Sequence, residues 1–507
     1  MDKLKDWILD NNILYLVVGT IFSVFSIGRY NIVISIYIWP FCFLHYLHKN
    51  EFKIIPLIIV SLCLLFSNMF RWIGSTDLNI GVDFLLGAYF SVINIIPFLI
   101  DDIFYKKISG WKSALIFPLS VASCEFLFQF NIIANTNLYA YAHRENLQYL
   151  QIISLFGVYF LSFVIALFSS ILDYSLDLFS SENRYSKMIY SYIIIILIIY
   201  FFGFIRLLIP QDKETYNIAC SIGITQNLYD KGEDCVLPAE DYYDYINNKL
   251  EMANSSNSQF MIFAEEAFAI KIKDKEKLIN KTKELAQKYN IFVVLPIDIS
   301  EKEDELHNTN EAVLISEEGD VLYNYQKQHL VPYIERGYYE NMDKVEVIDT
   351  KFGKLSTVIC YDINFPYFIN SLSRKHFDLL LIPSWDWEGI AEYHSNELKY
   401  RAIEGGFNAI KNTANGITIS NDAKGRTLTY YREKDYEDYF VISTVNRKGV
   451  KTLYSYIGFL FNYIYIISII CILISGPMYE KLCGDKSRSS SKVMQKLDDL
   501  NIDYEED

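Results

Sequence analysis

Long apolar runs are the feature of this sequence that most limits how it can fold. Seven of them fall within residues 1–210, and an eighth follows far downstream. A helix needs roughly 20 mostly apolar residues to cross the hydrocarbon core of a bilayer, and each run is about that long. The runs lie near 11–28, 31–47, 54–70, 80–100, 112–131, 149–172, 188–209 and 453–476.

We therefore expect a multi-pass α-helical membrane domain at 1–210, with about seven transmembrane helices, and a C-terminal transmembrane helix at 452–476. The two shortest runs could instead be re-entrant or buried within the helix bundle. Composition agrees, since 51% of the residues are hydrophobic and 16% are aromatic, which exceeds the average of soluble domains.

Lysine and arginine are distributed unevenly among the segments that join the runs. Cytoplasmic segments of membrane proteins carry an excess of these residues. With the N-terminus inside, the charge count also puts the charged tail 477–507 in the cytoplasm. Residues 215–447 then lie on the extracytoplasmic side of the cell membrane. Inside fall Lys49, Lys53, Lys106, Lys107, Lys112, Arg184 and Lys187, and outside fall Arg29, Arg71 and Arg144.

Residues 215–447 alternate strand-like and helix-like patterns. Apolar strands are expected at 216–224 and 260–264, and a charged amphipathic helix at 275–289. The polar stretch 317–320 separates two short apolar segments, which predicts a hairpin. Such alternation is typical of a layered α/β domain.

A cysteine follows the apolar pair Val358 and Ile359, which we expect to end a buried strand. Pro366, shortly afterwards, suits the first turn of a helix. A thiol between a strand and a helix can face a substrate, and the helix N-terminus favours its thiolate. Cys360 is therefore a candidate nucleophile. A buried structural cysteine, the commoner fate of a lone thiol, is the alternative.

Two further segments place charged residues after apolar strands. Glu265 and Glu266 follow one such strand, and Lys327 and Glu335 follow another. Carboxylate, lysine and cysteine in this chain order, each at the end of a strand, resemble the Glu-Lys-Cys triad of the nitrilase superfamily.

Two motifs make the resemblance more specific. Ile-Cys-Tyr-Asp-x-x-Phe-Pro at 359–366 is similar to the cysteine motif of that superfamily, and Lys-x-His-Leu-Val-Pro-Tyr-x-Glu at 327–335 resembles its apolipoprotein N-acyltransferase branch. In that branch the catalytic domain lies within a multi-pass membrane protein. The resemblance implies that residues 215–447 form a nitrilase-like αββα sandwich.

The resemblance also assigns roles to the candidate residues. A free thiol is only a few per cent ionised at neutral pH, so Cys360 needs a base. Glu265 is expected to be that base and later the general acid, although Glu266 is not excluded. Lys327 would stabilise the oxyanion of a tetrahedral intermediate. Supporting roles fall to Glu335, to the backbone N–H of Tyr361 and to Asp362.

The reaction that this resemblance implies is a two-step acyl transfer. Cys360 would take a fatty acyl chain from a phospholipid as a thioester, and the N-terminal amine of a lipid-modified apolipoprotein would then accept it. Donor and acceptor both reside in the bilayer, so a membrane-tethered site raises their effective concentration. The net charge of -15 argues against a nucleic-acid partner. We expect a monomer, and neither a metal nor a cofactor.

Two other functions remain open from the sequence. A membrane-tethered amidase of the same superfamily would use the same triad with water as acceptor. A non-enzymatic membrane protein would use its outer domain only to bind partners. Within the membrane domain, Glu125 falls in the fifth apolar run. Such a residue usually faces a cavity or the bundle interior, where it would orient a headgroup or a loop, or be paired structurally.

Overall fold

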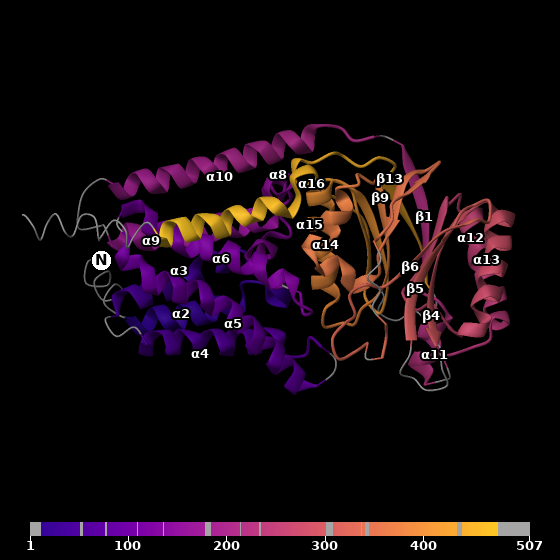
Figure 1. The fold of residues 1–507 in the computed structure, drawn as a ribbon, viewed down its shortest axis with the longest axis horizontal. Helices are drawn as coiled ribbons and strands as arrows, with labels where there is room; N and C mark the ends of the chain where they lie inside the picture. Colours follow the sequence, from indigo (N-terminus) through magenta and orange to yellow (C-terminus); the bar gives the residue numbers. More distant parts are fainter. Residues whose placement is uncertain are drawn as a thin grey trace, which may run out of the picture.

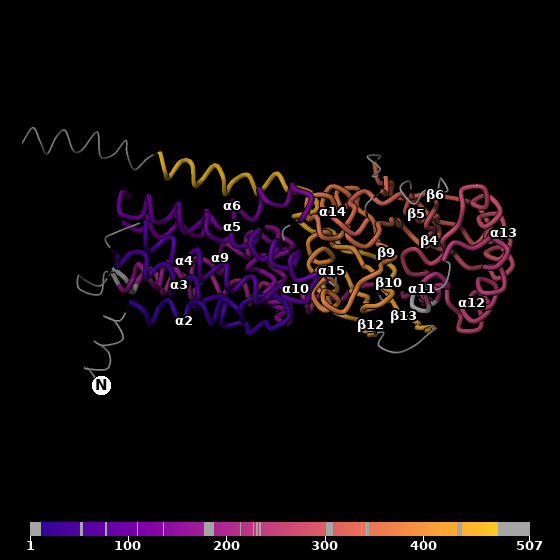
Figure 2. The backbone as a smooth tube through the Cα atoms, turned by 90° about the horizontal axis from the view of Figure 1, so that it is seen from below, coloured from indigo at the N-terminus to yellow at the C-terminus, as the bar shows by residue number. Residues whose placement is uncertain are grey.

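The computed structural model describes residues 12–474, apart from short gaps at 51–53, 77–78, 109, 135, 178–183, 213, 233–234, 301–307, 336, 340–343 and 433–438. Figure 1 shows an elongated molecule with a bundle of helices at one end and an α/β domain at the other. The C-terminal helix (yellow) returns along the helical end, as the turned view in Figure 2 also shows. The predicted tail at 477–507 lies outside the described residues.

The helical end is built from the apolar runs of the sequence. Within the described residues, six helices are long and apolar enough to cross a bilayer. On α4, for example, Ile58, Leu62 and Phe66 are each more than half exposed. Their spacing of four residues makes one apolar stripe, which suits contact with lipid chains. The chain is thus a membrane protein. The six candidate spans are Ile54–Trp72, Ile80–Lys107, Gly110–Phe130, Val158–Leu176, Lys187–Leu208 and Leu453–Ile474.

Not every apolar run forms one long helix. The first two runs become α2 and α3, of 13 and 15 residues, so the count of about seven transmembrane helices stays a prediction. The helices of this part are α2 (Asn12–Val24), α3 (Ser35–Lys49), α4 (Ile54–Trp72), α5 (Ile80–Phe104), α6 (Ile116–Leu127), α7 (Leu147–Leu150), α8 (Ile153–Phe156), α9 (Val158–Asp177), α10 (Arg184–Leu208) and α16 (Leu453–Ile457).

The run predicted near 149–172 is interrupted at Gly157. Helix α8 ends one residue before this glycine, and α9 begins one residue after it. Gly157 has φ +78°, and a Cβ added there would collide with the ring of Tyr454. A glycine is therefore required both by the backbone conformation and by the close approach of the C-terminal segment.

The α/β domain contains two sheets, of seven and six strands. In the first, β1, β2 and β4 are parallel, and β4, β5 and β6 are antiparallel. In the second, β8, β9 and β10 are parallel. The first sheet holds β1 (Thr215–Ser221), β2 (Phe260–Phe263), β3 (Phe268–Lys271), β4 (Phe292–Ser300), β5 (Asn308–Ile315), β6 (Val321–Gln326) and β13 (Phe440–Asn446). The second holds β7 (Ile348–Thr350), β8 (Gly353–Thr357), β9 (Leu379–Trp385), β10 (Asn408–Ala414), β11 (Ile417–Asn421) and β12 (Thr427–Arg432).

The two sheets stack face to face between two layers of helices (Figure 1). Helices α12 (Tyr243–Ser255) and α13 (Lys275–Tyr289) cover the outer face of the first sheet, while α14 (Pro366–Ser373) and α15 (Ala391–Gly405) cover the second and face the membrane helices. One apolar core lies between the sheets and a second beneath α12 and α13. The predicted αββα sandwich is thus confirmed.

Polar contacts fix the sandwich to the ends of the membrane helices. The Lys399 ammonium donates to the backbone carbonyl of Arg144 at 2.9 Å, and the carboxylate of Glu404 accepts the N–H of Val158 at 2.7 Å. The first pair joins α15 to the segment between α6 and α9, and the second joins it to the first residue of α9. The second sheet therefore keeps a fixed position above the bundle.

Candidate active site

The three predicted catalytic side chains come from strand ends at one edge of the sandwich. Glu265 follows β2 by two residues, Lys327 directly follows β6, and Cys360 begins a short 3-10 helix, Cys360–Asn364, after β8. Strand β8 ends at Thr357, so Val358 and Ile359 are not strand residues as the sequence predicted. They form the connection that leads to the thiol.

Lys327 lies between two carboxylates. Its ammonium donates to Oε1 of Glu265 at 2.7 Å and to Oε1 of Glu335 at 2.8 Å. The lysine is 1% exposed, and burial alone would lower its pKa. The charges of Glu265, Glu335 and Cys360 outweigh burial, so the pKa of Lys327 rises well above its usual value. The ammonium is therefore permanently charged.

Glu265 is held by three donors from three elements. Besides Lys327, its Oε1 accepts the side-chain amide of Asn310 on β5 at 2.8 Å. Its Oε2 accepts the backbone N–H of Trp385, at the end of β9, at 2.8 Å. Neither Asn310 nor Trp385 was predicted from the sequence as a partner of Glu265. The polar Asn310 within an otherwise apolar strand was the one signal available.

The neighbouring carboxyl, Glu266, has a different environment. Its residue has φ +54°, and the Asn310 amide reaches its Oε1 at 3.3 Å. Burial, then Asp298 and Glu265, raise the pKa of Glu266 well above its usual value. Burial likewise raises the pKa of Asp298 to about 7. The site thus holds several carboxyl groups around one ammonium, and this environment favours the protonated form of Glu266.

Cys360 has a backbone conformation that is rare for a residue with a side chain. Its φ is +45°, in the left-handed region that non-glycine residues avoid. Its thiol is 4% exposed and lies 3.7 Å from the backbone carbonyl of Trp385. Burial, followed by the negative charge of Glu265, raises its pKa well above the usual value. The group is a thiol at rest, so the predicted helix-stabilised thiolate is not what this environment favours.

Asp362 supports the turn that carries the thiol. Its Oδ2 accepts the hydroxyl of Tyr325 at 2.6 Å and the N–H of Ile359 at 3.0 Å. Its Oδ1 accepts the N–H of His329 at 2.9 Å and lies 2.8 Å from Nδ1 of the same ring. With 0% exposure, this carboxylate ties the cysteine turn to the loop after Lys327.

A cluster of three ionisable residues lies next to the thiol on the side of the second sheet: Asp386, His394 and Lys411. None of the three was predicted from the sequence as a site residue. The Lys411 ammonium bonds to Oδ2 of Asp386 at 2.5 Å, and Nδ1 of His394 lies 2.7 Å from Oδ1. Cys360, Asp386 and His394 offer potential metal-ligand atoms within 4.8 Å of one another. A similar set comprises Glu265, Glu266 and Glu335. Each set already contacts a positive charge of the protein: Lys411 bonds to Asp386 in the first set, and Lys327 bonds to Glu265 and Glu335 in the second.

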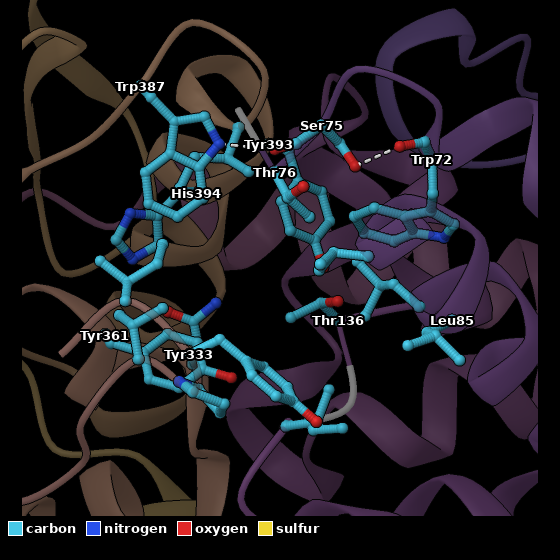
Figure 3. Close-up of a pocket in the computed structure, with 18 of the residues that line it drawn as sticks. Trp72, Ser75, Thr76, Leu85, Thr136, Tyr333, Tyr361, Trp387, Tyr393 and His394 are labelled. Carbon is cyan, nitrogen blue, oxygen red and sulfur yellow. Dashed lines mark hydrogen bonds between the residues drawn. The ribbon is translucent and has the colours of Figure 1, made fainter. Parts of the chain in front are cut away.

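An apolar cavity of about 190 Å³ reaches from Cys360 to the membrane helices. Figure 3 shows Trp72 and Leu85 of the bundle facing Tyr361 and His394 of the sandwich across it. Leu85 is 68% exposed and lies in a candidate membrane span, so it marks the rim toward the lipid. The other lining residues are Ser75, Thr76, Val82, Leu86, Phe90, Ile133, Thr136, Val331, Pro332, Tyr333, Ile334, Asn364, Trp387, Ile390 and Tyr393.

Of two residues singled out in the sequence, Tyr361 lines this cavity and Glu125 does not. The Tyr361 side chain lines it, and its hydroxyl lies 3.4 Å from the carbonyl of Ile132. Glu125 is 3% exposed and does not line the cavity. Its carboxylate accepts the N–H of Tyr139 at 2.8 Å. Of the roles left open for Glu125, this contact fits the orientation of a loop.

Comparison with known protein families first shows the class of the α/β domain. Residues 251–451 match the carbon-nitrogen hydrolase family. The chain therefore contains a carbon-nitrogen hydrolase domain of the nitrilase superfamily, joined to membrane helices.

Individual relatives add to this. The chain is 26% identical over 314 residues to an apolipoprotein N-acyltransferase of Geobacter metallireducens. The matched segment covers 56% of this chain and 59% of the relative. The chain is 33% identical over 141 residues to a deaminated glutathione amidase of Dictyostelium discoideum, which covers 25% and 48%. An amidase structure from Nesterenkonia sp. matches with a TM-score of 0.38 at 16% identity, over 48% of this chain and 94% of that one. The chain spans about half to three-fifths of these two curated relatives.

Proposed function

We propose that this protein is a membrane acyltransferase that moves a fatty acyl chain from a phospholipid to the N-terminal amine of a lipid-modified apolipoprotein, by way of a thioester on Cys360. The carbon-nitrogen hydrolase domain supports acyl chemistry on a thiol. The match to the N-acyltransferase supports the membrane-bound acceptor, since it runs over more residues than the hydrolase domain contains.

The observation that carries the proposal is the apolar cavity between the thiol and the bundle. Its walls come from α4 and α5 on one side and from the sandwich on the other. A small hydrophilic amide has no use for an apolar chamber that opens on a lipid-facing helix. An acyl chain does, because burying each methylene stabilises binding by about 0.8 kcal/mol.

The first step is acylation of the thiol. Glu265 removes the proton of Cys360, and the sulfur attacks the ester carbonyl of the phospholipid. Lys327 and the N–H of Tyr361 stabilise the oxyanion. When the tetrahedral intermediate collapses, the carbon–oxygen bond breaks and Glu265 returns the proton to the leaving lysophospholipid.

The second step releases the acyl chain. The acceptor amine attacks the thioester, a carbon–nitrogen bond forms, and the sulfur leaves as a thiol after it regains a proton. With water in place of the amine, the same step would make the protein a hydrolase, as in the amidase relative. The acceptor therefore separates the two functions.

We further propose the topology that the charge count predicts. Residues 1–210 form the membrane domain, 215–447 the extracytoplasmic catalytic domain and 452–476 a final span, with 477–507 in the cytoplasm. An impermeant maleimide applied to intact cells should then label Asn254→Cys, on the exposed side of α12, and should not label Lys107→Cys. Labelling of Lys107→Cys without labelling of Asn254→Cys would contradict this orientation.

The function is tested with the purified full chain in phospholipid vesicles that contain a diacylglyceryl-cysteine peptide. We expect acylated peptide and lysophospholipid in equal amounts, and neither from Cys360→Ala. Cys471→Ala is the matched control, because that thiol is exposed on the C-terminal helix. Free fatty acid in place of acylated peptide would identify a hydrolase. Unchanged transfer by Cys360→Ala would overturn the proposal.

A further inference from the structure

The Asp386, His394 and Lys411 group has a geometry that the two-step reaction does not yet use. Asp386 follows β9, His394 lies on α15 and Lys411 lies on β10. All three are at most 2% exposed. An isolated salt bridge would need only the carboxylate and the lysine, yet the imidazole is aimed at the cavity that contains the thiol.

Hydrogen bonding fixes the tautomer of His394. Its Nδ1 lies 2.7 Å from Oδ1 of Asp386, and a carboxylate only accepts, so Nδ1 carries the hydrogen. Lys411 lies 3.1 Å from Nδ1, but its ammonium bonds to the other carboxylate oxygen at 2.5 Å. The second nitrogen, Nε2, therefore presents a lone pair.

That nitrogen has no hydrogen-bond partner among the described residues, although it is fully buried. Buried polar atoms are nearly always paired, and an exception calls for an explanation. His394 lines the cavity together with Cys360, and one of its ring nitrogens lies within 4.8 Å of Sγ. A substrate group bound beside the thiol is the partner that this position fits.

The imidazole is uncharged at neutral pH. Burial, and then the positive charge of Lys411, lower the pKa of His394, while Asp386 and Glu265 oppose this effect. The charged or titratable groups that face the ring are thus Asp386, Lys411, Cys360 and Glu265. A neutral ring with a free lone pair can accept a proton, and Nε2 presents that lone pair to the cavity beside the thiol.

We propose that His394 is the base of the second half-reaction. This role rests on the proposed function. An N-terminal amine has a pKa near 8, so it arrives mostly as an ammonium that cannot attack. Nε2 takes one proton from this ammonium, and the freed amine attacks the thioester carbonyl. The carbon–sulfur bond breaks, and the imidazolium gives its proton to the leaving sulfur. The new amide nitrogen releases its remaining excess proton to solvent, so that the amide, the thiol and the neutral ring are all restored.

The test separates the two half-reactions of the full chain. The acyl-enzyme is formed from phospholipid, observed by intact mass, and then mixed with either the diacylglyceryl-cysteine peptide or hydroxylamine. Hydroxylamine is largely uncharged at pH 7 and needs no base. We expect His394→Asn, whose amide can still donate to Asp386, to acylate normally and to react with hydroxylamine within about threefold of wild type. Its transfer to the peptide at pH 7 should fall by about 100-fold or more.

The pH dependence gives a second, independent readout. Wild-type transfer to the peptide should be nearly flat between pH 6 and 8, whereas that of His394→Asn should rise about tenfold per unit as the amine loses its proton. His376→Asn is the control, because that residue lies outside the cavity with φ +53°, which asparagine tolerates.

Four outcomes distinguish the claims. Normal peptide transfer by His394→Asn, or equal loss of transfer to both nucleophiles, would overturn the role of His394 and leave acyl transfer intact. If the variant does not fold, a steep wild-type rise between pH 6 and 8 would also overturn it. Absence of the acyl-enzyme in wild type would instead overturn the proposed function itself.

Discussion

The thiol of Cys360 and the carboxyls around Lys327 depend on one another for their protonation states. Burial keeps the thiol protonated, and burial followed by the nearby carboxyls of Asp298 and Glu265 favours the protonated form of Glu266. Glu265 differs because Lys327, Asn310 and the Trp385 N–H all donate to it. These three donors fix the position of the Glu265 side chain, and we propose that this held side chain is the one that receives the thiol proton.

Replacing each of the adjacent glutamates by glutamine distinguishes their roles. Glu265→Gln should slow acylation by roughly 100- to 10,000-fold, because the amide cannot accept the thiol proton. Glu266→Gln should change the rate less than about threefold, since glutamine has the shape and charge of a protonated glutamic acid. The rate of thioester formation, measured by intact mass in single-turnover mixing, checks both. The reverse pattern would make Glu266 the base.

The raised pKa of Asp298 predicts how the stability of the fold changes with pH. Its pKa is about 7 in the folded protein and about 3.9 in an unfolded chain. Between these values the folded state holds one more proton than the unfolded state, so this group stabilises the fold at low pH and loses that contribution as pH rises toward 7.

Asp298→Asn, which is neutral throughout, should therefore raise the melting temperature by a few degrees at pH 8 relative to wild type, and by more than at pH 5. The exposed Asp241→Asn should not alter the pH dependence. Differential scanning fluorimetry in detergent from pH 5 to 8 measures this. A variant that gains most at pH 5 would contradict the assigned protonation.

The short helix Cys360–Asn364 and the loop after β6 act together as the support of the nucleophile. A left-handed residue costs about 1–3 kcal/mol and persists only where its surroundings enforce it. Here Asp362 enforces it by accepting from Tyr325, His329 and the N–H of Ile359.

Asp362→Ala should lower both stability and acylation, with an expected loss of more than about tenfold in rate, because several buried donors lose their acceptor. Tyr325→Phe removes one of these hydrogen bonds. It should lower the free energy of unfolding by at most about 3 kcal/mol, the upper end of the range for a hydrogen bond to a carboxylate. Melting temperature and the rate of thioester formation measure the two effects. Full activity of folded Asp362→Ala would show that the turn does not depend on this carboxylate.

Helix α5 forms one wall of the cavity that we propose to hold the acyl chain. Leu86→Trp should fill part of this space, as overpacking of an apolar site does. We expect palmitoyl transfer to fall about tenfold or more while butyryl transfer from a short ester changes little. Leu62→Trp, on the exposed face of α4, is the control. The ratio of kcat/KM for palmitoyl transfer to kcat/KM for butyryl transfer should fall in Leu86→Trp and stay unchanged in Leu62→Trp.

As a whole, the molecule follows the sequence where local patterns are strong and departs from it where distant segments meet. The predicted helix at 275–289 coincides with α13, and the residues after three strands do converge at one edge of the sandwich. Periodicity shows where a strand ends, and strand ends of neighbouring strands meet.

The rest of the site depends on tertiary contacts that no local pattern encodes. Asp386, His394 and Lys411 come from two strands and a helix, and a buried lysine within β10 reads in sequence as an ordinary strand residue. The break at Gly157 depends on the ring of Tyr454, nearly 300 residues later. The cavity is lined by α5 and by the loop after Lys327, which are more than 200 residues apart in the sequence.

The most direct test of the account is the mass of the intact protein after incubation with phosphatidylethanolamine of defined acyl chains and no acceptor. We expect one added acyl group per chain, located on Cys360 by peptide mapping, removed by hydroxylamine and lost when the diacylglyceryl-cysteine peptide is added. An unmodified Cys360 in protein that still acylates the peptide, or an acyl group on another residue, would contradict it.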